Sequence, residues 1–194
     1  MGKSTFARNY LPSFPYINGD EIKRQAELSG QRIDTHSLRL TVQDRINNHV
    51  QHKESFAFES NLVSNYSFDI VNDLSAKGYQ TCLFYIGAND LAVLNSRIAQ
   101  RVQEGLHYVS PEDVKQRYQE ALKKLPSNLK HFDKAVFLDN SVQGAAPTEI
   151  LHLERGIIKW RTTAEPVWVA QILPTIQRLS SAYEKLAGKK KTNL

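Results

Sequence analysis

Hydrophobic positions along the chain fall into short runs that alternate with longer periodic stretches. The short runs are compact and apolar or aromatic, and polar or turn residues bound each of them. The runs that predict buried strands are residues 16–18, 55–59, 80–86 and 134–139. Because helical patterns separate these runs, parallel strands joined by crossover helices are expected. The pattern therefore predicts an α/β layered fold.

The periodic stretches predict amphipathic helices. Leu38, Val42, Ile46 and Val50 repeat every four residues. A second apolar stripe follows Ser67, and Gly78 is placed as its C-terminal stop. Both segments are expected to pack one face on the sheet.

A helical hairpin above the sheet is predicted over about residues 90–125. Asn89 can cap its first helix, which carries the apolar stripe Leu91, Leu94, Ile98 and Val102. Ser110 as N-cap and Pro111 at the first helical position start the second helix.

The C-terminal region, about residues 147–188, predicts a β-hairpin followed by a last helix. Residues 148–153 and 157–161 flank Arg155-Gly156, which suits a tight turn with glycine at a positive φ. The last helix carries an apolar stripe from Ile172 to Leu186.

Length and composition predict one globular domain over residues 1–194. The chain has 41% hydrophobic and 23% charged residues, which excludes disordered, collagenous and disulfide-stapled classes. Its single cysteine, Cys82, is expected to be a small core residue within a strand. No stretch approaches the roughly 20 apolar residues that span a bilayer, and no signal peptide is evident, so a cytoplasmic protein without membrane contact is expected.

The net charge of +5 is not expected to reflect nucleic-acid binding. Three of the charges are Lys189, Lys190 and Lys191 of the tail, so the rest of the chain carries only +2. That charge, without a basic face or interleaved aromatic residues, is too small for a duplex-binding surface.

The most informative motif is the N-terminal run Gly2-Lys3-Ser4-Thr5, the closing half of the phosphate-loop pattern GxxxxGK[ST]. In such a loop, backbone N–H groups and a helix N-terminus hold phosphate oxygens. The lysine reaches the β and γ phosphates, and the hydroxyl binds Mg²⁺. Gly2, Lys3, Ser4 and Thr5 are therefore candidate ATP-binding residues, with Ser4 also a Mg²⁺ ligand.

Several further blocks in the same order resemble the zeta-toxin-like family of P-loop kinases, in its chromosomal branch of small predicted ATPases. The resemblance covers about residues 2–141. The blocks are GKSTFAR (2–8), INGDEI (17–22), SFAFESNL (55–62), GY (78–79), the helix with Arg97 and Arg101, GLHYV (105–109) before Arg117-Tyr118, and LDNS (138–141).

The resemblance implies a P-loop NTPase fold of three layers, with a mostly parallel sheet and a helical lid. It also implies an ATP- and Mg²⁺-dependent phosphotransferase acting on a hydroxyl of a small molecule. Zeta toxins proper phosphorylate a UDP-linked amino sugar, so a nucleotide sugar is the substrate class that the family suggests, and an antitoxin protein is a possible partner.

Asp20 follows a short strand in Asn-Gly-Asp, so its carboxylate is expected where open α/β sheets place ligands. The family resemblance implies that it is the base that accepts a proton from the substrate hydroxyl. The alternative is a helix N-cap for residues 21–28, a position that aspartate fills equally well.

Glu59 ends the next strand and resembles the family glutamate that contacts substrate or the water shell of the metal. Asn61 stands where many relatives carry threonine, and this departure changes the length and chemistry of a substrate-binding side chain. The alternative is that Glu59 and Asn61 cap the segment that begins near Leu62.

Arg97 and Arg101 are four residues apart on one predicted helix, and Arg117 lies on its partner. Guanidinium groups match phosphate oxygens and stabilise charge in the transition state, so a lid that closes over the transferred phosphate is one interpretation. The other is an exposed helix face that pairs with Glu104 and Glu120.

Members of the resembled family begin with an apolar strand and the first half of the phosphate loop, and this sequence starts after both. One expectation is a start codon further upstream, with about 15 to 20 more residues, which allows a strand of about six residues and the remaining loop. The alternatives are that the sequence is a truncated piece, or that another segment takes the place of the missing strand. The alternative function is a catalytically impaired nucleotide-binding or partner-binding module, such as a toxin remnant held by an antitoxin. A nucleic-acid-binding protein is third.

Overall fold

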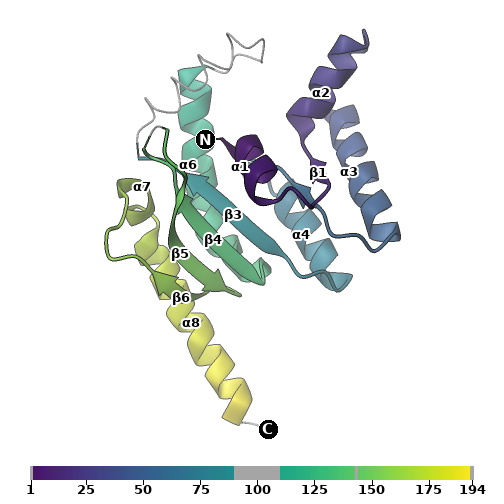
Figure 1. The fold of residues 1–194 in the computed structure, drawn as a ribbon. Helices are drawn as coiled ribbons and strands as arrows, with labels where there is room; N and C mark the ends of the chain where they lie inside the picture. Colours follow the sequence, from purple (N-terminus) through teal and green to yellow (C-terminus); the bar gives the residue numbers. More distant parts are fainter. Residues whose placement is uncertain (1, 90–109, 143, 193–194) are drawn as a thin grey trace. The chain divides into compact units, whose positions relative to one another are not determined.

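The computed structural model of the chain describes residues 2–89, 110–142 and 144–192 (Figure 1). The chain divides into two compact units, Met1–Ser60 and Asn61–Leu194. Each unit has its own β-sheet. The expected single domain over residues 1–194 stays a prediction.

The first unit is built around a short parallel sheet. Its elements are α1 (Lys3–Tyr10), β1 (Tyr16–Ile17), α2 (Gly19–Leu28), α3 (Thr35–Gln51) and β2 (Ala57–Phe58). Tyr16 pairs with Ala57 and Ile17 with Phe58. Both strands lie within the predicted runs 16–18 and 55–59 but are shorter than those runs.

The predicted helix around residues 38–50 is confirmed as α3. Asp34 caps it, because its carboxylate accepts a hydrogen bond from the backbone N of Ser37 at 2.7 Å. Along the predicted stripe Ile46 is buried, while Leu38, Val42 and Val50 are half-buried. The four-residue period therefore did mark the inner face of this helix.

The second unit contains a mixed four-stranded sheet in the order β3-β4-β5-β6. Its elements are α4 (Tyr66–Ala76), β3 (Cys82–Gly87), α6 (Pro111–Asn128), the 3₁₀ helix η1 (Leu129–His131), β4 (Lys134–Asp139), β5 (Thr148–Glu154), β6 (Ile157–Arg161), α7 (Val167–Ala170) and α8 (Leu173–Thr192). β3 and β4 are parallel, whereas β4–β5 and β5–β6 are antiparallel. The predicted α/β class is confirmed, and the P-loop NTPase fold stays a prediction.

The predicted hairpin turn at Arg155-Gly156 is confirmed between β5 and β6. Both residues have positive φ, 48° at Arg155 and 77° at Gly156. Two consecutive positive φ angles are those of a type I′ turn, whose twist matches the twist of the flanking strands. Figure 1 shows α8 following this hairpin and continuing to the end of the described chain.

Local signals also placed the helix ends of this unit. Ser110 caps α6, because its Oγ accepts a hydrogen bond from the backbone N of Asp113 at 3.1 Å, and Pro111 opens the helix. Gly78, with φ of 85°, follows the end of α4 as expected. The helix predicted to carry Leu91 and Leu94, with most of the lid, lies outside the described residues.

The core prediction for Cys82 is wrong. Cys82 is the first residue of β3, which is an edge strand of its sheet, and its side chain is exposed. Within the described residues, no helix has the length and apolarity to cross a membrane.

α7 packs on the carboxyl ends of β3 and β4 through Trp168, which is fully buried. The indole Nε1 donates to Asp139 Oδ1 at 2.8 Å, and the backbone N of Trp168 donates to Asn89 Oδ1 at 3.1 Å. The indole ring lies on Gly87, where an added Cβ would come within 2.4 Å of it. Glycine is therefore required at position 87 for this close approach.

Gly87→Ala is expected to lower the free energy of unfolding by about 1–3 kcal/mol, because the new methyl group overpacks the Trp168 site. Urea denaturation followed by circular dichroism measures the change. Gly188→Ala is the matched control, since no atom lies within 4 Å of an added Cβ there. If the two variants had the same stability, the close packing of Trp168 on Gly87 would be contradicted.

Candidate functional site

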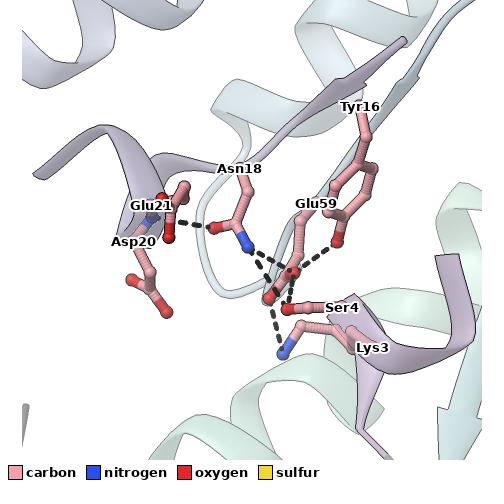
Figure 2. A network of polar contacts seen from close by, with 7 residues as sticks. All are labelled: Lys3, Ser4, Tyr16, Asn18, Asp20, Glu21 and Glu59. Atoms are coloured by element: carbon pink, nitrogen blue, oxygen red, sulfur yellow. Dashed lines mark hydrogen bonds and ion pairs between the residues drawn. The ribbon is translucent and has the colours of Figure 1, made fainter. Parts of the chain in front are cut away.

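Four polar side chains of the first unit meet around the carboxylate of Glu59 (Figure 2). Together with Glu59 they are named the Glu59 cluster, which consists of Lys3, Ser4, Tyr16, Asn18 and Glu59. Ser4 and Glu59, which are in contact, lie 55 residues apart in the sequence. The cluster is thus a product of tertiary folding rather than of one motif.

The short sheet and α1 bring these side chains together. Asn18 follows β1 and Glu59 follows β2, so both stand at the carboxyl ends of parallel strands. Gly2 has an extended backbone and precedes α1, which places Lys3 and Ser4 in the first turn. A ligand site at the carboxyl ends of parallel strands and beside a helix N-terminus is typical of α/β proteins.

One carboxylate oxygen of Glu59, Oε2, accepts hydrogen bonds from three donors. They are Tyr16 OH at 2.5 Å, Ser4 Oγ at 2.8 Å and Asn18 Nδ2 at 3.2 Å. Oε1 lies 3.3 Å from Lys3 Nζ in an ion pair. The side chain of Glu59 is only 12% exposed and that of Lys3 is 44% exposed, so the lysine is the solvent-facing member.

Burial and hydrogen bonding act on the pKa of Glu59 in opposite directions. Burial raises it, whereas the charge of Lys3 and the hydrogen bonds from Tyr16, Ser4 and Lys3 lower it, and the net result is a pKa below the ordinary value. Burial and the neighbouring Glu59 charge raise the pKa of the Tyr16 phenol. At neutral pH Glu59 is therefore an anion and Tyr16 a neutral donor.

Asn18 joins the cluster to the start of α2. Its Oδ1 accepts hydrogen bonds from the backbone N atoms of Asp20 at 2.9 Å and Glu21 at 3.3 Å, so Asn18 is the N-cap. Its Nδ2 donates to Ser4 Oγ and to Glu59. The alternative interpretation of Asp20 as the cap is wrong, because α2 begins at Gly19 and Asp20 already lies in the first turn.

Of the predicted phosphate-binding residues, Lys3 and Ser4 enter the cluster. Gly2 is the N-cap residue of α1, and its carbonyl accepts from the backbone N of Phe6 at 2.9 Å. Thr5 is exposed in the same turn of α1. Asp20 is exposed beside the cluster, and Figure 2 shows its carboxylate outside the group of contacts around Glu59.

Of the two predicted substrate-binding residues, Glu59 lies in the cluster and Asn61 does not. Asn61 is exposed and belongs to the second unit. The alternative that Glu59 and Asn61 cap the following helix is wrong, because α4 begins only at Tyr66 with Asn65 at the N-cap position.

The predicted arginine lid is described only in part. Arg117 is exposed on α6 of the second unit, while Arg97 and Arg101 lie outside the described residues. Convergence of the three guanidinium groups stays a prediction.

Sequence reasoning missed Tyr16 and Asn18. Asn18 had a local signal, because asparagine between a strand and a Gly-Asp pair is a favoured N-cap. No local signal identified Tyr16, because its partner is 43 residues away.

Oxygen atoms of Ser4 and Glu59 lie side by side, and hydroxyl and carboxylate oxygens are ligands that suit Mg²⁺. Among the described residues, no group of three or more His, Cys, Asp or Glu side chains is arranged to hold a metal. A Mg²⁺ ion in this cluster would thus depend on few protein ligands, as is usual where phosphates supply the others. The residues present fit such an ion.

Comparisons of the chain with protein-family models, with curated proteins and with solved structures found no significant match.

The depressed pKa of Glu59 predicts that the first unit loses stability in acid. A carboxyl group whose pKa is lower in the folded state stabilises the fold above its unfolded pKa of about 4.3, and this contribution disappears as the pH falls through the folded value. The difference in unfolding free energy between wild type and Glu59→Gln should therefore shrink between about pH 6 and pH 3. Urea denaturation at each pH measures it.

Glu27→Gln is the control for the loss of a surface carboxylate, because the Glu27 side chain is 57% exposed and lies 3.9 Å from Lys23. A difference for Glu59→Gln that does not depend on pH, or that only equals the difference for Glu27→Gln, would contradict the account of the Glu59 charge.

Proposed function

We propose that the chain is an ATP- and Mg²⁺-dependent phosphotransferase of the zeta-toxin-like kinase type, which phosphorylates a hydroxyl of a small molecule such as a nucleotide sugar. The observation that carries the proposal is the Glu59 cluster. In this cluster, the lysine and the hydroxyl of a Gly-Lys-Ser motif at the start of α1 contact the ionised carboxylate of Glu59.

Three residues of the cluster, Lys3, Ser4 and Glu59, have proposed roles that their positions support. Lys3 is half exposed and held by one ion pair, so its ammonium is accessible to the β and γ phosphates of ATP. The unbonded N–H groups of the first turn of α1 favour phosphate at the same place. Ser4 and Glu59 would hold Mg²⁺, which neutralises charge on the phosphate oxygens when it is bound.

Asp20 is the proposed base toward the substrate hydroxyl. It is exposed in the first turn of α2 beside the cluster, and Asn18 rather than Asp20 caps this helix. Phosphoryl transfer needs such a carboxylate mainly to position and polarise the attacking oxygen. Arg97, Arg101 and Arg117 are proposed to stabilise the transferred phosphate.

A second candidate is a nucleotide-binding or partner-binding module without catalysis, for which an antitoxin would be a partner. The observation in its favour is that Lys3 and Ser4 are both engaged by Glu59. Both candidate functions include nucleotide binding, but only the phosphotransferase would convert ATP and an acceptor to products.

Lys3→Ala is expected to weaken Mg-ATP binding by roughly 10- to 100-fold, since a hydrogen bond to a charged group contributes about 1.5–3 kcal/mol. Isothermal titration calorimetry measures the affinity. Lys23→Ala is the matched control, because the Lys23 side chain is 41% exposed and sits on α2 in a similar surface ion pair. Equal affinities for the two variants would exclude a phosphate-binding role of Lys3.

Asp20→Asn is expected to lower turnover by about 10²- to 10⁴-fold, the usual contribution of a general base. The melting temperature and ATP affinity should change little, because Asn18 rather than Asp20 caps α2. The assay follows ATP consumption with a UDP-linked amino sugar as acceptor, and Asp44→Asn on α3 is the control. Nucleotide binding without turnover in the wild type would favour the non-catalytic module.

A further inference from the structure

A cavity of about 440 Å³ lies in the second unit, away from the Glu59 cluster in sequence. It is bounded by the C-terminal half of α4, by η1 and by the β5–β6 turn. The polar and charged residues that line it are Asn72, Ser75, Lys130, His131, Asp133 and Arg155. Its size falls within the range of about 300–1,000 Å³ that is typical of small-molecule sites.

Arg155 is fixed at the cavity by two contacts with Asp133. Its backbone N donates to the carbonyl O of Asp133 at 3.1 Å, and its Nε donates to Asp133 Oδ1 at 3.2 Å. Its side chain is nevertheless 80% exposed. The terminal N–H groups of the guanidinium therefore remain available, and their planar fork matches phosphate oxygens.

Lys130 is held on the same rim by buried neighbours. Leu129 and Phe132 on either side of residues 130 and 131 are buried, so Lys130 is turned outward and exposed. The turn packs closely on η1, because a Cβ added at Gly156 would lie 3.3 Å from Lys130 Cα. Two cations on separate elements thus face one cavity.

Asp133, the acidic residue of the lining, is engaged by the protein itself. Its Oδ2 accepts from the backbone N of Thr81 at 2.9 Å, and its Oδ1 accepts from Arg155. The hydrogen bond from Thr81 is the main cause that lowers the pKa of Asp133, and Arg155 adds to it. Burial and the neighbouring Lys130 lower the pKa of His131, which keeps it uncharged at neutral pH. The lining therefore carries one net positive charge, from Lys130 and Arg155 against Asp133.

The backbone conformation at Arg155 is unusual for an arginine. Its φ of 48° is left-handed, a conformation in which Asn, Asp and Gly are favoured and arginine is not. Turn geometry alone would thus be served better by asparagine. The arginine is instead explained by its side chain, which pairs with Asp133 and lines the cavity.

We propose that this cavity binds a small phosphorylated molecule, whose phosphate oxygens contact the Lys130 ammonium and the Arg155 guanidinium. Asn72 and Ser75 at the end of α4 supply neutral polar groups for the rest of the ligand. The site is independent of the phosphotransferase proposed for the first unit, since none of its residues belongs to the Glu59 cluster.

The test titrates inorganic phosphate into the full chain at low ionic strength, in a Lys3→Ala background that removes the candidate phosphate lysine of the first unit. Calorimetry should detect saturable binding. Arg155→Asn and Lys130→Gln should each weaken it by about tenfold or more, in keeping with charge-assisted contacts. Lys134→Gln is the control, because Lys134 is exposed nearby on β4 but does not line the cavity.

Melting temperatures separate binding from structure. Arg155→Asn should change the melting temperature little while phosphate binding weakens, because asparagine suits the left-handed turn position and this offsets the loss of the exposed ion pair with Asp133. If Arg155→Asn lowers the melting temperature as well, Lys130→Gln on η1 decides the outcome by itself. Absence of phosphate binding, binding that Lys134→Gln weakens equally, or binding only of an oligonucleotide would each overturn the proposal.

Discussion

The ionised carboxylate of Glu59 is the constraint around which the first unit is organised. A buried charge is strongly unfavourable unless it is paired and hydrogen-bonded. Glu59 meets this requirement with donors from the first turn of α1, from β1 and from the residue after β1. The strands β1 and β2 pair over only two residues each, which is little for an isolated sheet. The side-chain contacts of Glu59 therefore hold the start of α1 and the ends of β1 and β2 together.

The second unit places another carboxylate, Asp139, at the end of its own parallel pair. Asp139 Oδ1 accepts from Trp168 Nε1 at 2.8 Å and from Ser141 Oγ at 2.7 Å. Trp168 is fully buried and presses on Gly87, so this strand end is closed by packing. At Glu59 the outermost partner is instead the half-exposed Lys3. Of the two carboxylates, Glu59 is thus the one that is paired with a half-exposed, flexible lysine side chain.

Features with local causes were predicted from the sequence. The Arg155-Gly156 turn follows from the conformational freedom of glycine, and the start of α6 follows from Ser110 and Pro111. The strands of the parallel pairs were found from apolar runs, although β1 and β2 proved shorter than the runs. Lys3, Ser4 and Glu59 were predicted from a motif and a family resemblance, and the fold does bring them together.

Features with tertiary causes were not predicted. Asp20 and Asn18 are both good N-caps by residue type, and the choice of Asn18 coincides with contacts of its amide to Ser4 and Glu59. The phenol of Tyr16 contacts Glu59 because the register of β1 against β2 pairs Tyr16 with Ala57, two residues before Glu59. Cys82 sits in an apolar run, yet its side chain is exposed, as is that of Phe84 two residues further along the same face of β3.

Lys3 pairs with Oε1 of Glu59, whereas Ser4, Tyr16 and Asn18 donate to Oε2, and this arrangement determines how a phosphate could enter the cluster. A phosphate that binds Lys3 takes the place of Glu59 Oε1 as the partner of the ammonium, so the ammonium stays paired with an anion. If Ser4 also turns toward a metal ion, Oε2 still accepts from Tyr16 and Asn18. The carboxylate then keeps two hydrogen bonds and its place, while Oε1 becomes available to the metal ion. A phosphotransferase at this site thus needs Tyr16 and Asn18 for a reason that the Gly-Lys-Ser motif does not contain: they hold the buried charge while Lys3 and Ser4 exchange partners.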